Sequence, residues 1–351
     1  MGRGDHGVGF FHGDCHRLFA DYVLIGFESS EGGGRMEKTG QRNDNKLDSG
    51  VGNQFIKGAA RVATALGVST LIIGLTVVAL GTSAPELLVS LRAATTASSD
   101  IALGNVIGSN IANIGVILAI SALITPIKLD WSIFRREIPF VIGFSVLVLL
   151  MALDGELGRV DGLILVLSFA AFSTLIYRQA IRERAEIEPD LAVYEQEERL
   201  TKRAPLVWEA VRVIGGLLVL IVGAQFLVDS SVNIARAFGV SDLVIGITMV
   251  AVGTSLPELT ICVLASLRRE DDIVLGNVLG SNISNLLVIV GVVALIQPIS
   301  VPRPVQTFDL PVMVVFAGLL LLFVRGRTLT RRAAPVFLLA YAAFIALTLV
   351  R

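Results

Sequence analysis

The stretch GTSAPELLVS, residues 81–90, decides the fold, because it places a proline and a carboxylate inside an apolar run long enough to cross a bilayer. Pro85 has no backbone N–H and frees the carbonyl of Gly81, so we expect the helix to break at its middle. A charged side chain at membrane depth is costly, and it usually faces the protein interior or a water-filled cavity. Glu86 is therefore a candidate functional residue.

The same pattern recurs as GTSLPELTIC, residues 253–262, at an offset of 172 residues (Gly81 to Gly253). Residues 67–91 and 239–263 align without a gap, and 15 of the 25 aligned positions are identical. A duplication of this length indicates two structural repeats. If each repeat has five spans, an odd number, the copies cross the membrane in opposite directions, and broken helices in such inverted repeats usually line ion sites. Glu258 is then the counterpart of Glu86.

Composition places the chain among multi-pass membrane proteins. Of its 351 residues 54% are hydrophobic and 17% are charged, and the mean hydropathy is +0.75, well outside the range of soluble domains. The net charge of −1 gives no reason to expect nucleic acid or a polybasic lipid anchor. Cys15 and Cys262 stand in a polar tail and in an apolar span, so we expect no disulfide framework.

Apolar segments of the length that a bilayer requires predict an all-α protein with nine clear spans. A strongly charged segment, residues 178–206, separates the two halves and is expected to be a cytoplasmic loop, because basic residues gather on the connections that share its side of the membrane. The predicted spans are residues 68–94, 101–124, 138–153 and 157–177 before this loop, and 211–238, 243–267, 273–296, 308–324 and 333–350 after it.

The N-terminal segment, residues 1–53, is polar and rich in glycine, and it lacks the layout of a signal peptide. We expect it to be disordered, or to result from a misassigned start. It contains His12, Cys15 and His16, but no second pair of ligands at zinc-like spacing, so we expect no metal site there.

The repeat alignment places the counterpart of the span 211–238 at residues 39–66. Only residues 53–66 look helical in that stretch. The first helix of the first repeat is therefore predicted to be missing or truncated. On this division the first membrane repeat covers residues 54–177 and the second covers residues 207–351.

A second pair of matching motifs follows the glutamates: GNVIGSNIANIG, residues 104–115, and GNVLGSNISNLL, residues 276–287. On a helix Ser109 and Asn113 lie four positions apart and so on one face, as do Ser281 and Asn285. Oxygen ligands without His or Cys form a hard site, which suits Ca²⁺ better than zinc or copper. Two glutamates balance the charge of one Ca²⁺ or of two Na⁺.

Each of these small polar residues also has a purely structural interpretation. Ser and Thr often bond to the preceding turn of a membrane helix, Asn often joins neighbouring helices, and Gly-xxx-Gly spacing, as at Gly104 and Gly108, permits close packing. A glutamate beside a helix-breaking proline, present in both copies, is much harder to explain structurally. The functional interpretation therefore depends on Glu86 and Glu258.

The paired GTSxPEL and GNxxGSNIxN motifs identify residues 54–351 as similar to the calcium/cation antiporter superfamily, in its prokaryotic sodium/calcium exchanger branch. The resemblance implies a ten-helix inverted-repeat fold with a central site between the second, third, seventh and eighth helices. It also implies that Ca²⁺ and Na⁺ are cargo, that no cofactor is needed, and that a monomer acts in a prokaryotic plasma membrane. By matching motif, the implied metal ligands are Thr82, Ser83, Glu86, Ser109 and Asn113 of the first repeat, Thr254, Ser255, Glu258, Ser281 and Asn285 of the second, and the backbone carbonyls of Ala79 and Ala251.

Other functions remain open at this point. Many relatives carry Asp at the position of Asn285, so the Na⁺ stoichiometry and any role for K⁺ are undetermined. A H⁺/Ca²⁺ exchanger of the same superfamily would protonate Glu86 or Glu258 in place of binding Na⁺. A cation channel could also combine acidic side chains with backbone carbonyls, although channels usually assemble them from several subunits. The spans contain no His and no nucleophile–base pair, so we do not expect an enzyme.

Overall fold

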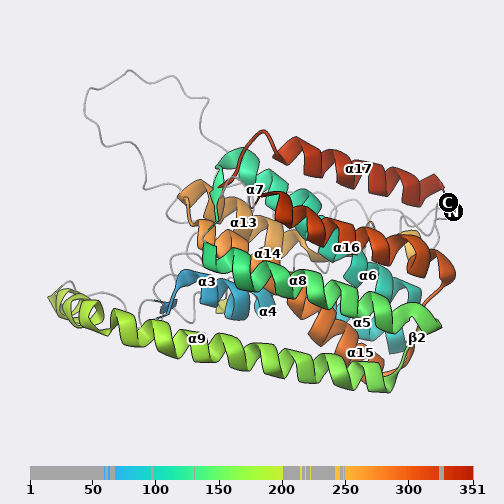
Figure 1. The fold of residues 1–351 in the computed structure, drawn as a ribbon, viewed down its shortest axis with the longest axis horizontal. Coiled ribbons are helices and arrows are strands. Elements are labelled where there is room, and N and C mark those ends of the chain that lie inside the picture. The colour runs from blue at the N-terminus through green and yellow to red at the C-terminus, as the bar shows by residue number, and fades with distance from the viewer. Residues whose placement is uncertain are drawn as a thin grey trace, which may run out of the picture.

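The computed structural model describes residues 68–95, 99–129, 131–200, 250–323 and 328–350, together with 59, 62–63, 214–215, 218, 222, 242–245 and 248. The described residues form a bundle of helices (Figure 1). Four of these helices are long and apolar enough to cross a membrane, and a bent pair adds a fifth candidate. The predicted tail 1–53 lies outside the described residues, and so does nearly all of the segments 53–66 and 211–238.

In the first broken span one helix ends just before Ser83 and another begins just after it. This residue has φ −80° and ψ 5°, and the helices on its two sides bend by 40°. Proline at the second position of the new helix explains the break, because it supplies no N–H to the preceding turn. The pieces in chain order are α3 (Thr70–Ile73), η2 (Gly74–Val78, a π-helical segment), α4 (Ala79–Thr82) and α5 (Ala84–Thr95).

The next span is continuous and ends where a proline follows. At Thr125 the backbone becomes extended, with φ −140° and ψ 130°, as expected for a residue that precedes a proline such as Pro126. In the second repeat Gln297 ends the equivalent span before Pro298 in the same way, with φ −136° and ψ 116°. The two spans consist of α6 (Ser99–Ala112), η3 (Asn113–Leu118) and α7 (Ala119–Ile124), and of α14 (Asp271–Ser284), η6 (Asn285–Ile289) and α15 (Val290–Ile296).

The second broken span breaks at Ser255, the counterpart of Ser83, with φ −84° and ψ 9°. It comprises α11 (Asp242–Ile245), α12 (Ala251–Thr254) and α13 (Leu256–Arg268). The remaining helices surround these two pairs of spans. They are α8 (Trp131–Met151) with η4 (Ala152–Asp154), α9 (Arg159–Leu200), η7 (Val305–Asp309) with α16 (Leu310–Leu319) and η8 (Leu320–Phe323), and α17 (Ala334–Val350).

The prediction of a loop over residues 178–206 is wrong for its first part, because α9 continues as a helix to Leu200. The segment 178–200 is rich in Ala, Arg, Gln and Glu, which favour helix, and it contains no glycine. Its charge prevents it from crossing a membrane but does not prevent it from being helical. In Figure 1 α9 runs along one side of the bundle and α17 along the opposite side.

Two short antiparallel strand pairs join the repeats, and we call them the first and the second clasp. In the first clasp β1 (Ile127–Lys128) pairs with β4 (Thr328–Leu329). In the second clasp β2 (Glu156–Leu157) pairs with β3 (Ile299–Ser300). The apolar residue of every strand is buried. Each clasp therefore takes one strand from each repeat.

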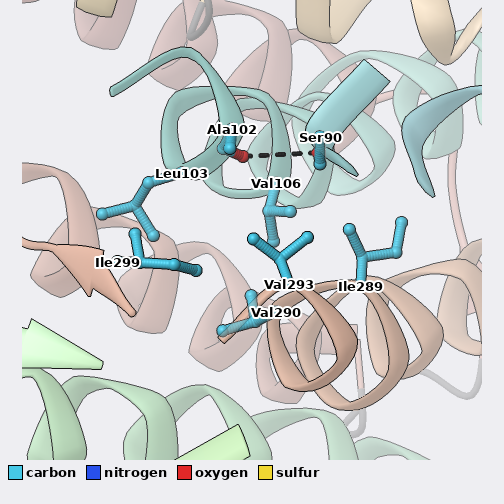
Figure 2. A pocket seen from close by; sticks show the side chains of 8 residues that line it. All are labelled: Ser90, Ala102, Leu103, Val106, Ile289, Val290, Val293 and Ile299. Atoms are coloured by element: carbon cyan, nitrogen blue, oxygen red, sulfur yellow. Dashed lines mark hydrogen bonds between the residues drawn. The ribbon is translucent and has the colours of Figure 1, made fainter. Parts of the chain in front are cut away.

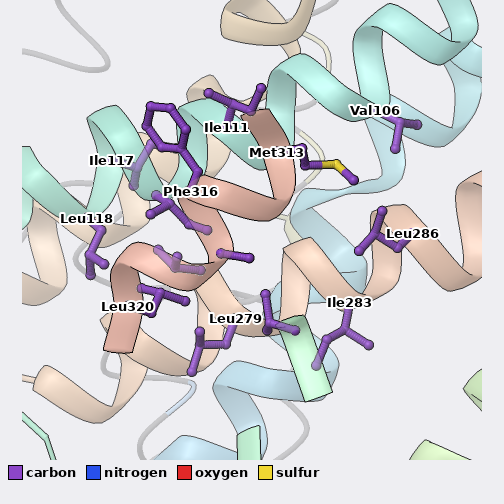
Figure 3. Close-up of a cluster of buried hydrophobic side chains, with 14 of the residues drawn as sticks. Val106, Ile111, Ile117, Leu118, Leu279, Ile283, Leu286, Met313, Phe316 and Leu320 are labelled. Atoms are coloured by element: carbon purple, nitrogen blue, oxygen red, sulfur yellow. The ribbon is translucent and has the colours of Figure 1, made fainter. Parts of the chain in front are cut away.

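The apolar core fills the space between the two continuous spans and α16. Figure 3 shows Ile111 and Ile117 of the first repeat on the same side of the cluster as Phe316, with Leu279 and Ile283 of the second repeat facing them. Close backbone contact completes the packing at Gly276, where a Cβ atom would lie 2.7 Å from the carbonyl oxygen of Leu71. Gly276 is the counterpart of Gly104, so in the second repeat this glycine serves close helix packing, as the Gly-xxx-Gly spacing allows.

Candidate cation-binding site

The two helix breaks bring the glutamates to the first turns of α5 and α13. Leu87 donates its backbone N–H to the carbonyl of Ser83 at 3.1 Å, and Leu259 donates to that of Ser255 at 3.0 Å, so each new helix begins at the serine. Glu86 therefore stands three residues after one break, as Glu258 does after the other. The prediction that both spans break at the motif is confirmed.

Each glutamate accepts a hydrogen bond from the serine of the opposite repeat. Oγ of Ser255 donates to Oε1 of Glu86 at 3.0 Å, and Oγ of Ser83 donates to Oε1 of Glu258 at 3.3 Å. Ser281 also reaches Oε1 of Glu258, at 3.5 Å. Both carboxylates are fully buried. The two motifs, which are far apart in the sequence, thus form one cluster.

The other predicted ligands are all buried as well. Thr82 donates to the carbonyl oxygen of Ala79 at 3.2 Å, and Thr254 donates to that of Ala251 at 3.3 Å. Oγ of Ser109 also donates to the carbonyl oxygen of Ala251, at 3.3 Å. Both backbone carbonyls that the resemblance implied therefore lie beside predicted side-chain ligands.

Four buried oxygens of the predicted ligands have no hydrogen-bond partner among the described residues. They are Oε2 of Glu86, Oε2 of Glu258, Oδ1 of Asn113 and Oδ1 of Asn285. A buried polar atom without a partner is costly, and in a native structure such an atom often indicates a missing ion or water molecule. Carboxylate and amide oxygens are the atoms that a hard cation would bind.

The charge of the two carboxylates is not balanced by any basic side chain within the cluster. No Lys or Arg in the described ranges is buried. Two adjacent buried carboxylates without a counter-charge are unstable as a pair of anions. A bound cation or a proton must therefore compensate them.

Asn113 and Asn285 differ in how firmly the described residues hold them. Nδ2 of Asn113 donates to Oδ1 of Asn282 at 2.9 Å. Within the described chain neither amide atom of Asn285 has a hydrogen-bond partner. Each of these two asparagines begins a π-helical segment, η3 or η6, and such segments occur often at functional sites.

Four asparagines that were not predicted from the sequence lie among the contacts between the repeats. Asn105 and Asn277 contact the threonines, and Asn282 donates to the backbone carbonyl of Asn110 at 3.5 Å. A signal was present, because all four recur at the repeat offset and Asn105 lies four positions before Ser109 on the same face. The possible zinc ligands His12, Cys15 and His16 lie outside the described residues.

Comparison with known proteins gives consistent matches. The chain matches the family described as "Sodium/calcium exchanger protein" over residues 49–178 and 208–350. The sodium/calcium exchanger MaX1 of Methanosarcina acetivorans is 32% identical over 325 residues, which is 83% of this chain and 92% of the relative. The putative antiporter CaxA of Alkalimonas amylolytica is 40% identical over 247 residues, or 70% of this chain and 76% of the relative. A structure of the sodium-calcium exchanger NCX_Mj has a TM-score of 0.70 at 34% identity and covers 84% of this chain and 92% of that one.

Proposed function

Because the chain belongs to the sodium/calcium exchanger family and is therefore a multi-pass membrane transporter of cations rather than an enzyme, we propose that it exchanges cytoplasmic Ca²⁺ for external Na⁺. The observation that carries this proposal is the pair of buried carboxylates that, among the described residues, lack a basic partner and each keep one unpartnered oxygen. Two negative charges match one Ca²⁺ or two Na⁺, so the same oxygens can hold either cargo. The relatives named as sodium/calcium exchangers support this choice of ions.

In the proposed mechanism Glu86 and Glu258 supply the charge, and neutral oxygens complete the coordination. Ca²⁺ takes six to eight oxygen ligands, and the unpartnered oxygens of Asn113 and Asn285 add to those of the glutamates. The serine and threonine hydroxyls keep lone pairs available after donating their hydrogens. Na⁺ that enters down its gradient competes for the shared carboxylates and displaces Ca²⁺.

The coupling between the two fluxes follows from the cost of buried charge. An empty site whose two carboxylates are both ionised leaves two uncompensated charges inside the protein, which opposes any transition that encloses them. A site filled by one Ca²⁺ or two Na⁺ is neutral and can be enclosed. The transporter therefore changes its access from one side of the membrane to the other only when loaded, as an exchanger requires.

A Na⁺-gradient assay tests the proposal. Purified protein in proteoliposomes loaded with NaCl is diluted into Na⁺-free medium with radioactive calcium, and uptake is followed with and without an ionophore that dissipates the Na⁺ gradient. We expect saturable calcium uptake that the ionophore abolishes. Uptake that follows an imposed pH gradient and ignores Na⁺ would instead identify a H⁺/Ca²⁺ exchanger, and conductive flux that does not saturate would identify a channel.

We also propose that the functional unit is a monomer in the plasma membrane of a prokaryote. Both halves of the site come from one chain, so no second copy is needed to complete it. Cross-linking of the protein in native membranes, followed by activity measurement of the monomeric fraction, tests this proposal.

A further inference from the structure

Two asparagines outside the predicted ligand set connect the repeats at the site. Oδ1 of Asn277 on α14 accepts a hydrogen bond from Oγ1 of Thr82 at 3.1 Å, and Oδ1 of Asn105 on α6 accepts one from Oγ1 of Thr254 at 3.0 Å. Each asparagine thus contacts a threonine of the opposite repeat. We infer that Asn105 and Asn277 are positioning residues, which hold the oxygen ligands of one repeat in register with those of the other.

The orientation of the Asn277 amide follows from its partners on the other side. Nδ2 donates to the backbone carbonyl oxygen of Glu258 at 3.4 Å and to Sγ of Cys262 at 3.2 Å. A carbonyl oxygen can only accept, so the amide nitrogen must face it and Oδ1 must face Thr82. The hydroxyl of Thr82 therefore donates its hydrogen to Asn277 or to the Ala79 carbonyl, and its lone pairs stay available to a cation.

Asn105 repeats this arrangement in the first half of the chain. Its Nδ2 donates to the backbone carbonyl oxygen of Glu86 at 3.3 Å and to Oγ of Ser90 at 3.0 Å. Ser90 occupies the position that Cys262 holds in the second repeat. The same contacts thus occur in two copies built from different acceptor side chains, which argues against an accidental contact.

These hydrogen bonds connect the ligands of the first repeat to those of the second. One amide, that of Asn277, binds both the backbone of Glu258 and the hydroxyl of Thr82. A displacement of α13 relative to α4 must therefore break one of these hydrogen bonds. Asn105 ties α5 to α12 in the same way, so the coordination distances across the repeats depend on both amides.

An apolar crevice lies beside Ser90, one of the two acceptors of the Asn105 amide. Figure 2 shows Ser90 and its hydrogen bond of 3.4 Å to the carbonyl of Ala102 at the edge of an apolar crevice, with Val106 on the same side and Val290 and Val293 opposite. The crevice is lined almost entirely by apolar side chains, and it leaves no room for a water molecule. A variant without the Asn105 amide would leave its former partners unsatisfied.

A double-mutant cycle tests the inference, which rests on the proposed calcium transport for its first measurement. Asn277→Leu and Thr82→Val should each raise the half-saturating calcium concentration by about tenfold in the proteoliposome assay. If Asn277 acts through Thr82, the half-saturating calcium concentration of the double variant should also be raised only about tenfold. The effects of two substitutions that remove the same contact do not add. A double variant whose half-saturating calcium concentration is raised about a hundredfold, the product of the two single effects, would overturn the inference.

The inverted repeat supplies a matched control. Asn277 makes no hydrogen bond to Thr254 in the described structure, so the effects of Asn277→Leu and Thr254→Val, each about tenfold, should combine much closer to their product than those of the direct pair. Non-additivity in this crossed pair as well would show a general structural defect and would contradict the positioning role. If Asn277→Leu does not fold, the equivalent cycle of Asn105→Leu with Thr254→Val takes its place.

A second measurement does not depend on which ion the protein carries. The unfolding midpoints of the same variants in detergent, without added Na⁺ or Ca²⁺, should be non-additive in the direct pair and additive in the crossed pair. Additive midpoints in the direct pair would refute the positioning role even if the protein transports calcium. Absence of sodium-dependent calcium uptake by the unaltered protein, with non-additive midpoints, would refute only the proposed function.

Discussion

Ser255 donates a hydrogen bond of 3.0 Å to Glu86, a residue that precedes it by 169 positions. Ser83 makes the equivalent bond of 3.3 Å to Glu258. Each serine belongs to the break of one repeat and each glutamate to the helix that follows the other break. The charge of the site is therefore held by contacts between repeats, and each half of the chain is incomplete without the other.

The first prediction concerns the carboxylates. Glu86→Gln and Glu258→Gln each remove one charge but keep the shape of the side chain and its Oε1 atom. We expect sodium-dependent calcium uptake to fall by about a hundredfold or more, since truncating a buried charge contact costs about 2–5 kcal/mol. Glu156→Gln, at an exposed position on β2, is the matched control and should transport normally. Near-normal exchange by either buried variant would exclude the proposed site.

The second prediction concerns the neutral amide ligands. Asn113→Ala and Asn285→Ala each remove an unpartnered oxygen without changing the charge of the site. Water can take the place of a neutral ligand, so we expect the half-saturating calcium concentration to rise only about three- to tenfold, or about 1 kcal/mol. The assay is calcium uptake at varied calcium concentration. Effects larger than those of the glutamate variants would refute an account centred on charge.

The third prediction concerns close packing at Gly276. Gly276→Ala places a Cβ atom 2.7 Å from the carbonyl oxygen of Leu71 and 2.8 Å from Cα of Gly74, and both are backbone atoms that cannot rotate away. Overpacking of this kind typically costs about 1–3 kcal/mol. The unfolding midpoint in detergent should therefore fall, whereas Gly318→Ala, which lies in α16 and meets nothing within 4 Å, should keep it the same or raise it slightly, because alanine favours helix over glycine. Equal midpoints for both variants would contradict the close approach of α14 to α3.

The fourth prediction concerns the first clasp. Ile127 and Leu329 are direct partners in an antiparallel pair, a spacing that a disulfide can bridge. We expect Ile127→Cys with Leu329→Cys, in a background with Cys15→Ser, to cross-link under oxidation and to keep its transport rate, because this strand pair contains none of the predicted cation ligands. Loss of uptake on oxidation, with recovery after reduction, would show instead that the clasp opens during transport.

The sequence was sufficient for features that depend on local chemistry. Pro85 and Pro257 predicted the two breaks, and Pro126 and Pro298 stand where the continuous spans end. The membership of the sodium/calcium exchanger family also follows from the motif residues themselves. Each of these depends on what one residue does to its own backbone or on a pattern repeated at a fixed offset.

Features that depend on tertiary contact could not be predicted in the same way. Asn105 and Asn277 look like ordinary helix-packing residues until their partners, Thr254 and Thr82, are placed beside them. The length of α9 was also missed, because hydropathy indicates where a helix leaves the membrane and not where it ends. The first helix of the first repeat stays a prediction, since its residues lie outside the described part of the chain.

The contacts between repeats also constrain how the protein is made. The 169 residues between Glu86 and Ser255 take on the order of ten to thirty seconds to synthesise at about 5–20 residues per second. Throughout that time Glu86 lacks the serine that binds its carboxylate, and neither clasp can form because β3 and β4 follow Ser255 in the chain. The buried carboxylate of the first half therefore has to wait for the second half before its contacts are complete.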